Sequence, residues 1–139
     1  LDHSAIFLLI AGTYTPVCLL LPPASGLPLL AIAWGGAALG IVQSILWVHA
    51  PKPLVAGIYL ALGWAILPVL PTIRTVLGPA ALALLAGGGA AYTVGAIVYA
   101  AQRPDPFPRV FGYHEVFHAL VIAAAACHLA VVARAIPGL

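Results

Sequence analysis

Long apolar runs, separated by short polar or proline-rich breaks, dominate the pattern of the chain. The runs cover residues 5–21, 27–48, 54–70, 77–101 and 113–133. A helix needs roughly 20 apolar residues to cross the hydrocarbon core of a bilayer, and each run is close to that length. The runs are continuously apolar and do not alternate, which disfavours the strands of a membrane β-barrel. The pattern therefore predicts an all-α, polytopic bundle of five transmembrane helices.

Turn-forming residues and short lengths characterise the breaks between the runs. Prolines stand within 22–23 and 51–53, after the first two runs, and Pro71 follows the third. The most polar stretch of the chain, residues 102–109, separates the last two runs. Short connections make neighbouring helices antiparallel, and no stretch marks a second folded unit. We therefore expect residues 1–139 to form a single transmembrane domain.

Helix breakers also occur inside the runs. Pro16 lies in the first run, Pro68 near the end of the third, and the fourth contains three glycines at 87–89 and then Gly95. Small residues let helix backbones approach closely in membranes, so we expect these glycines to mark packing contacts. The alternative is that they form a hinge or leave a gap for a ligand.

Composition supports a lipid environment for the chain. Hydrophobic residues make up 64% of its 139 residues and charged residues only 6%, against about 25% charged residues in a typical soluble domain. The net charge of +2 and the lack of any basic run argue against a nucleic-acid partner. Cys18 and Cys127 both lie inside apolar runs, and we expect them to be buried thiols.

The charges at the breaks indicate an orientation. Counting crossings places Lys52, Arg103 and Arg109 on one side of the membrane, and Arg74 and Arg134 on the other. Lys and Arg are enriched in cytoplasmic loops, so the side with three cations is expected to face the cytoplasm.

Ionisable residues near the membrane interior are costly, and they are functional candidates by default. In this chain they gather at the starts of two helices: Asp2 and His3 at the first, and His114, Glu115 and His118 at the fifth. Four crossings return the chain to the side on which the first helix begins. Asp2, His3 and the two later histidines are therefore expected on one side of the membrane, at similar shallow depth.

His114 and His118 form an H-x-x-x-H pair. This spacing puts both imidazoles on one helix face, about 5–6 Å apart at Cβ, as in helical zinc sites. Zinc takes four ligands, three of them from the protein in a catalytic site, so two histidines alone are too few. Asp2 is a candidate for a further ligand or for an acceptor that holds the bound water. The alternative is that the histidines simply face lipid headgroups.

The remaining polar residues have simpler expected roles. Glu115 points away from the pair and is expected to be an interface charge or a helix N-terminal anion, with a catalytic role as the alternative. His128 lies roughly 15 Å deeper than His118 and is expected to hydrogen-bond to a neighbouring helix. His49 is expected at the interface. No chemistry is assigned to the polar side chains within the helices, which are Thr13, Thr15, Gln43, Ser44, Tyr92 and Thr93.

Two segments resemble the hemolysin III family, which belongs with the progestin and adipoQ receptors and so with the adiponectin receptors. Residues 1–16, LDHSAIFLLIAGTYTP, resemble the second signature of that family. Residues 111–118, FGYHEVFH, with the later ACH at 126–128, resemble its last transmembrane segment. The AYTVG at 91–95 and the Arg-Pro pair at 103–104 fit as well, so the resemblance runs along the whole chain.

The resemblance implies a seven-helix protein with its amino end in the cytoplasm, and this chain resembles helices three to seven. It also implies a zinc ion near the cytoplasmic side, held by three histidines. Two of these match His114 and His118, and an aspartate that interacts through the zinc-bound water matches Asp2.

The third histidine of the family comes from a Ser-x-x-x-His motif in the second helix, which has no counterpart in this chain. His3 is adjacent to Asp2 within the second signature, so the resemblance does not make it that ligand. The third ligand is therefore expected outside this chain. The chain contains no methionine, even at its first position, which agrees with an N-terminally truncated fragment of a longer protein.

Three functions are compatible with these features. The first is a zinc-dependent hydrolase of an amide in a lipid, with His114, His118 and Asp2 at the metal site and the bilayer delivering the substrate. The second is a pore-forming or cytolytic protein, as the name hemolysin implies, although no helix carries a polar stripe along its length. The third is a non-catalytic receptor or regulator of membrane state, in which zinc only staples the first and fifth helices. The expected location is the bacterial inner membrane, with the H-x-x-x-H side cytoplasmic.

Overall fold

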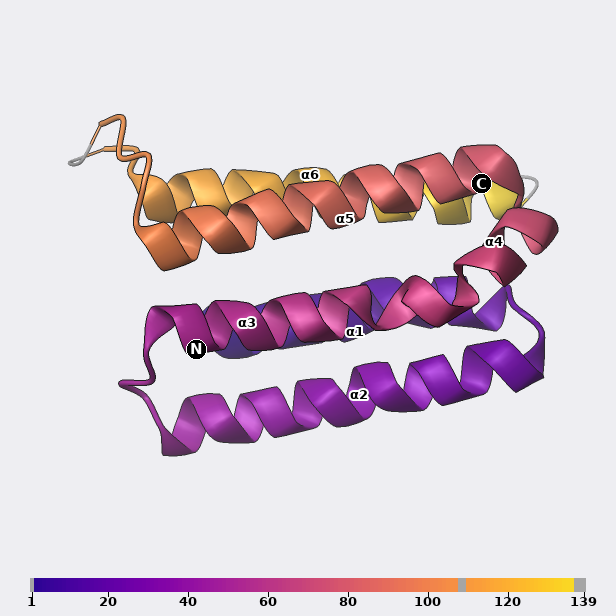
Figure 1. Ribbon diagram of the computed structural model, residues 1–139, viewed down its shortest axis with the longest axis horizontal. Helices are drawn as coiled ribbons and strands as arrows, with labels where there is room; N and C mark the ends of the chain where they lie inside the picture. Colours follow the sequence, from indigo (N-terminus) through magenta and orange to yellow (C-terminus); the bar gives the residue numbers. More distant parts are fainter. Residues whose placement is uncertain (1, 108–109, 137–139) are drawn as a thin grey trace.

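The computed structural model describes residues 2–107 and 110–136, and the side chains of Asp2 and His3 lie outside this description. Its helices are α1 (Asp2–Leu19), α2 (Pro23–Leu46), α3 (Lys52–Gly63), the 3-10 helix η1 (Trp64–Val69), α4 (Leu70–Val76), α5 (Gly78–Ala101) and α6 (Tyr113–Ala135). Because α3, η1 and α4 follow one another without a gap, five helical units run along the bundle (Figure 1). The predicted all-α bundle of five helices is confirmed.

Four of the five units are long and apolar enough to cross a membrane. They are Pro23–Leu46, Lys52–Val76, Gly78–Ala101 and Tyr113–Ala135. The fifth unit, α1, has a shorter apolar helix over Ser4–Leu20 in the part of the chain searched. Lipid-facing side chains surround the bundle, so the chain is an integral membrane protein, and bulky apolar residues such as Leu39 and Leu46 stand exposed on its outside.

Prolines mark the largest differences between the predicted and the observed helix ends. Pro23 was expected in a break, but it begins α2, because the first turn of a helix needs no N–H from that residue. The third helix was expected to end at Leu70, but the chain stays helical to Val76. Pro68 lacks an N–H and cannot make the α-helical hydrogen bond, and the chain around it forms the 3-10 helix η1 between α3 and α4.

The five units form a closed circuit in which units that follow one another along the chain are antiparallel, whereas α1 and α6, which also contact each other, are parallel (Figure 1). α1 packs on α2 and α6, α5 packs on α6 and α3, and α2 also contacts α3. We call the end at which α1, α3 and α6 begin the proximal end, and the opposite end distal. Lys52 and Arg103 lie at the proximal end, and Arg74 and Arg134 at the distal end, as the count of crossings predicted. Arg109 falls outside the described residues.

Small residues set the close contacts between helices. A Cβ at Gly40 of α2 would collide with the ring of Phe7 in α1, and one at Gly36 would lie 2.5 Å from Leu62 in α3. In α5, a Cβ at Gly88 would lie 2.7 Å from His128 of α6. The expectation that glycines mark packing is therefore confirmed at Gly88, whereas Gly87 has open space around it.

Candidate metal centre

The start of α6 is fixed by two acidic side chains. The Gly112 N–H donates to Oε2 of Glu115 at 2.8 Å, and the Tyr113 N–H donates to Oδ1 of Asp105 at 3.2 Å. The first N–H groups of a helix have no partner within the helix, so these carboxylates satisfy them. Glu115 therefore acts as the helix N-terminal anion that was one of its predicted roles, and His114 is held in the first turn.

The imidazoles of His114 and His118 face each other across one turn of α6. Their Nε2 atoms are 3.1 Å apart, and their ring centroids are 4.7 Å apart with an interplanar angle of 76°. Two Zn–N bonds of about 2.0–2.1 Å at a tetrahedral angle place the ligand nitrogens roughly 3.3 Å apart. The two Nε2 atoms are therefore already at the separation that one zinc ion requires. In the absence of a metal, one imidazole can donate an N–H to the other at this distance.

Aromatic rings surround the pair on the bundle side. Phe117 lies 6.3 Å from His114 and 5.2 Å from His118 between ring centroids, and Tyr99 lies 6.3 Å from His114. Phe117 and Tyr99 are 3% and 4% exposed, so they form a fixed floor beneath the two imidazoles. Such a floor limits water access to one side of the site, which strengthens electrostatic interactions there.

One cation stands close to this floor. The Lys52 ammonium donates to the Tyr113 hydroxyl at 2.6 Å, and it lies 4.9 Å from the Tyr113 ring centroid and 5.8 Å from that of Tyr99. Both tyrosine rings are also neighbours of His114. The first turn of α3 therefore contributes a positive charge to the proximal end of the bundle beside the histidine pair.

The structure tests only part of the predicted ligand set. α1 begins at the proximal end, as α6 does, and the two helices are in contact (Figure 1). The side chains of Asp2 and His3 lie outside the described residues, so the role of Asp2 stays a prediction. Among the side chains that are described, no third His, Cys, Asp or Glu joins His114 and His118 in a metal-binding group. The third ligand also stays a prediction.

The other histidines lie away from this pair. His49 is exposed in the connection between α2 and α3. His128 was expected to hydrogen-bond to a neighbouring helix, but within the described residues it makes a ring contact, 5.7 Å from the centroid of Tyr92 in α5. Gly88 admits this imidazole against the backbone of α5, because any larger residue would meet its Nε2 atom.

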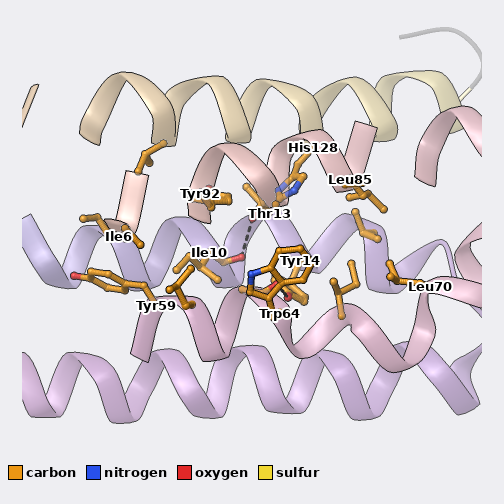
Figure 2. Close-up of a pocket in the computed structure, with 18 of the residues that line it drawn as sticks. Ile6, Ile10, Thr13, Tyr14, Tyr59, Trp64, Leu70, Leu85, Tyr92 and His128 are labelled. Carbon is orange, nitrogen blue, oxygen red and sulfur yellow. Dashed lines mark hydrogen bonds between the residues drawn. The ribbon is translucent and has the colours of Figure 1, made fainter. Parts of the chain in front are cut away.

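A cavity of about 80 Å³ lies within the bundle (Figure 2). It is enclosed by α1, α3, η1, α4, α5 and α6, whereas α2 contributes no lining residue. Phe117 lines the cavity and also contacts each imidazole, so its ring connects the cavity wall to the pair, whose own side chains do not line the cavity. Sequence reasoning missed this cavity, because its wall is assembled from separate helices whose facing sides periodicity did not resolve.

Fold and site together define a polytopic, all-helical membrane protein with a histidine pair at the start of its last helix. A family model described as "Haemolysin-III related" matches residues 1–129. The chain belongs to this family.

Curated relatives agree with this assignment. The chain is 38% identical over 127 residues to "Hemolysin-3 homolog" of Bacillus subtilis (strain 168), which covers 91% of this chain and 57% of that protein. It is 38% identical over 127 residues to "Hemolysin-3" of Bacillus cereus, with 91% and 55% covered. It is 33% identical over 151 aligned positions to "Adiponectin receptor protein" of Drosophila melanogaster, with 92% and 33% covered. The chain thus spans little more than half the length of the Bacillus relatives. No solved structure shows significant similarity to it.

Proposed function

We propose that this chain forms part of a zinc-dependent hydrolase that cleaves an amide bond in a membrane lipid. The observation that carries the proposal is the 3.1 Å separation of the Nε2 atoms of His114 and His118, which fits two ligands of one zinc ion. The similarity to hemolysin III proteins and to an adiponectin receptor protein gives the proposal its family context.

Three protein groups have roles in this proposal. His114 and His118 hold the metal through Nε2, and a third ligand comes from outside the described residues. A zinc ion bound there lowers the pKa of a coordinated water to near 7 and polarises a carbonyl oxygen. The Asp2 carboxylate orients the attacking water and accepts its proton. Phe117 and Tyr99 keep the underside of the imidazoles dry, because both rings are buried.

The cavity supports a lipid as the substrate. Its wall is mostly aliphatic and aromatic, as in Ile6, Ile10, Leu85 and Val121, so a hydrocarbon chain is the group it can accept with little desolvation cost. Phe117, which lines this cavity, contacts both imidazoles of the histidine pair. An acyl chain lying in it would bring the adjacent amide to the proximal end of the bundle.

The proposed location is the bacterial inner membrane with the proximal end in the cytoplasm. The two relatives from Bacillus support a bacterial membrane. Among the described residues, each end has two cations: Lys52 and Arg103 at the proximal end, and Arg74 and Arg134 at the distal end. In the sequence, Arg109 adds a third cation to the 103–109 connection, and an excess of Lys and Arg marks the cytoplasmic side. A cysteine-accessibility experiment with Ala50→Cys, at the proximal end, in intact and opened cells tests this orientation.

Amide hydrolysis tests the proposed reaction. The purified full-length protein in lipid nanodiscs is expected to release a free fatty acid from an N-acylated lipid, to lose this activity with a zinc chelator, and to regain it with added zinc. His118→Ala should be inactive, whereas His49→Ala, which removes an exposed histidine, should be as active as the unmodified protein. Chelator-resistant hydrolysis, or hydrolysis by His118→Ala, would contradict the proposal.

The same purified protein can be used to test two other functions, a pore and a non-catalytic zinc staple. The relatives' name, hemolysin, suggests membrane lysis, and dose-dependent dye release from liposomes that survives chelation would favour a pore. Within the described residues, however, the charged side chains stand at the helix ends and in the connections, and the cavity wall is apolar, which gives ions no polar path. A fold that melts on zinc removal, with no lipid ever cleaved, would favour a non-catalytic zinc staple.

A further inference from the structure

Three polar side chains from three helices converge on the cavity far from the histidine pair. They are Thr13 of α1, Tyr92 of α5 and His128 of α6, and all three line the cavity (Figure 2). His128 follows His118 by ten residues, so the cluster lies about 15 Å deeper along α6. This depth is near the middle of a hydrocarbon core that is about 30 Å thick. Polar groups at such a depth are costly unless they are paired.

The donor of Tyr92 has no partner in this cluster. Its hydroxyl oxygen is buried and makes no hydrogen bond within the described residues. Thr13 lies near Tyr92 in the cavity wall, but the two side chains form no hydrogen bond (Figure 2). The Thr13 hydroxyl instead donates to the Ile10 carbonyl oxygen at 2.9 Å, the dashed line in Figure 2, which leaves the lone pairs of Thr13 available as acceptors.

Tyr14, which lines the same cavity, has a hydroxyl that is hydrogen-bonded within the protein. Tyr14 donates to the carbonyl oxygens of Leu62 and Gly63, at 3.0 and 2.6 Å, where α3 gives way to η1. The two tyrosines share one cavity, yet the donor of Tyr14 is used within the protein and that of Tyr92 is not. The unpaired donor therefore points to a ligand and not to a general shortage of partners in the wall.

Thr13 and His128 also reach the outside of the bundle. A second hollow between α1 and α6 is lined by both residues, together with Gly12 and Leu129. A Cβ at Gly12 would meet nothing within 4 Å, and Leu129 is 68% exposed. The two polar residues therefore stand between the cavity and the outer surface of the described helices.

We propose that Thr13, Tyr92 and His128 bind the hydroxyl group of a lipid whose hydrocarbon chain is hydroxylated part-way along its length. Such a hydroxyl accepts the hydrogen bond of Tyr92 and donates its own proton to Thr13 Oγ1 or to the His128 ring. An unsubstituted chain fills the same apolar space but leaves the Tyr92 donor unpaired. The inference rests on the proposed function, because it takes the cavity as the place of the acyl chain, and it adds the substrate class.

Competition binding tests this inference without turnover. The full-length protein is placed in nanodiscs with a zinc chelator, with every tryptophan except Trp64 replaced by Phe, Trp34 and Trp47 among them, so that Trp64 reports from the cavity wall. A brominated octadecanoic acid quenches Trp64, and three unlabelled ligands displace it: octadecanoic acid, its 12-hydroxy derivative and its 2-hydroxy derivative. The last two are isomers, so they differ in where the hydroxyl lies and not in composition.

The 12-hydroxy ligand is expected to bind roughly three- to tenfold more tightly than the other two, the value of one net hydrogen bond. Tyr92→Phe should abolish this preference and leave the affinity for octadecanoic acid unchanged. Tyr14→Phe is the matched control, because it removes a hydroxyl from the same cavity and should keep the preference.

Equal binding of the two isomers, a preference that survives Tyr92→Phe, or no displacement by any of the ligands would overturn the inference. The assay is independent of hydrolysis, so the two proposals fail separately. Hydrolysis without discrimination between the isomers overturns only the hydroxyl site. Discrimination without hydrolysis overturns only the proposed reaction.

Discussion

Two polar regions of this bundle differ in how they are built. The histidine pair lies on a single helix at the proximal end, and its two Nε2 atoms are 3.1 Å apart. The cluster of Thr13, Tyr92 and His128 lies at mid-depth and takes one residue from each of three helices. The first region is set by local geometry that any helix imposes, whereas the second exists only when three helices pack correctly.

The two regions also differ in the cost of an unpaired group. At the proximal end, water and lipid headgroups can serve polar atoms that the protein leaves free. In the hydrocarbon region no solvent partner is present, and an unpaired group there costs several kcal/mol. The unpaired hydroxyl of Tyr92 is therefore more informative than the histidine pair. Four sets of substitutions test this difference between the two regions.

Loss of a ligand imidazole should have the largest effect. Removal of a side chain that only orients a ligand typically costs about 10–100-fold in metal affinity, so His118→Ala, which removes a ligand itself, should cost more than about 100-fold. Zinc affinity of the full-length protein is measured by competition with a chelating dye. His49→Ala should bind zinc normally, and zinc binding of equal strength in His118→Ala would remove the pair from the site.

A methyl group added at Gly88 should disturb the mid-depth cluster alone. Its Cβ would lie 2.7 Å from Nε2 of His128 and 3.2 Å from the Ala124 carbonyl oxygen. Forcing this contact should cost about 1–3 kcal/mol in the free energy of unfolding, measured in mixed micelles with added sodium dodecyl sulfate. Gly87→Ala, with nothing within 4 Å, should be neutral or up to about 1 kcal/mol more stable. Equal losses in both variants would contradict the packing described for Gly88.

Removal of one hydroxyl should have different effects at Tyr14 and Tyr92, two of the three tyrosines that line the cavity. Tyr14→Phe should lower the free energy of unfolding by about 1 kcal/mol, because it removes a hydrogen bond to the end of α3. Tyr92→Phe should leave it unchanged or raise it, because the hydroxyl has no hydrogen bond to lose and is costly to keep unpaired. The same unfolding assay compares them, and a larger loss for Tyr92→Phe would mean that its hydroxyl is already paired.

The smallest effect is expected at Lys52, which joins α3 to α6 through Tyr113. Lys52→Met keeps most of the length of the side chain but removes the charge, and it should cost about 0.5–1 kcal/mol at this partly exposed site. Lys52→Arg should restore most of the loss. Both variants should keep the preference for the 12-hydroxy ligand that depends on Tyr92. A loss of that preference would mean that the proximal end and the mid-depth cluster are energetically coupled.

The apolar runs predicted the helices because lipid imposes a minimum length of about 20 apolar residues on each crossing. The spacing of four residues also predicted that His114 and His118 face each other, because it follows from the helix alone. The continuation of the third unit from Leu70 to Val76 was not predicted, because Pro71 was expected to break the helix, whereas it lies in the first turn of α4, which needs no N–H from it.

The cluster at mid-depth was not predicted for a different reason. Thr13, Tyr92 and His128 each look like ordinary polar residues in an apolar run. Their convergence depends on the rotation of three helices about their axes, which the nearly uniform apolar character of each run leaves open. Gly88 was a local indication of a close helix contact, but the sequence does not show that His128 is its neighbour until α5 and α6 are paired.

α2 contributes no residue to the cavity wall, so the bundle has one helix that takes no part in the cavity. This helix has 24 residues, or roughly 36 Å of length, which exceeds the hydrocarbon thickness of an average bilayer by a few ångströms. Its outward face, with Leu39, Val42 and Leu46, is exposed on the outside of the bundle. Substitutions on that face therefore alter how the protein matches membranes of different thickness, while the cavity and the histidine pair keep their geometry.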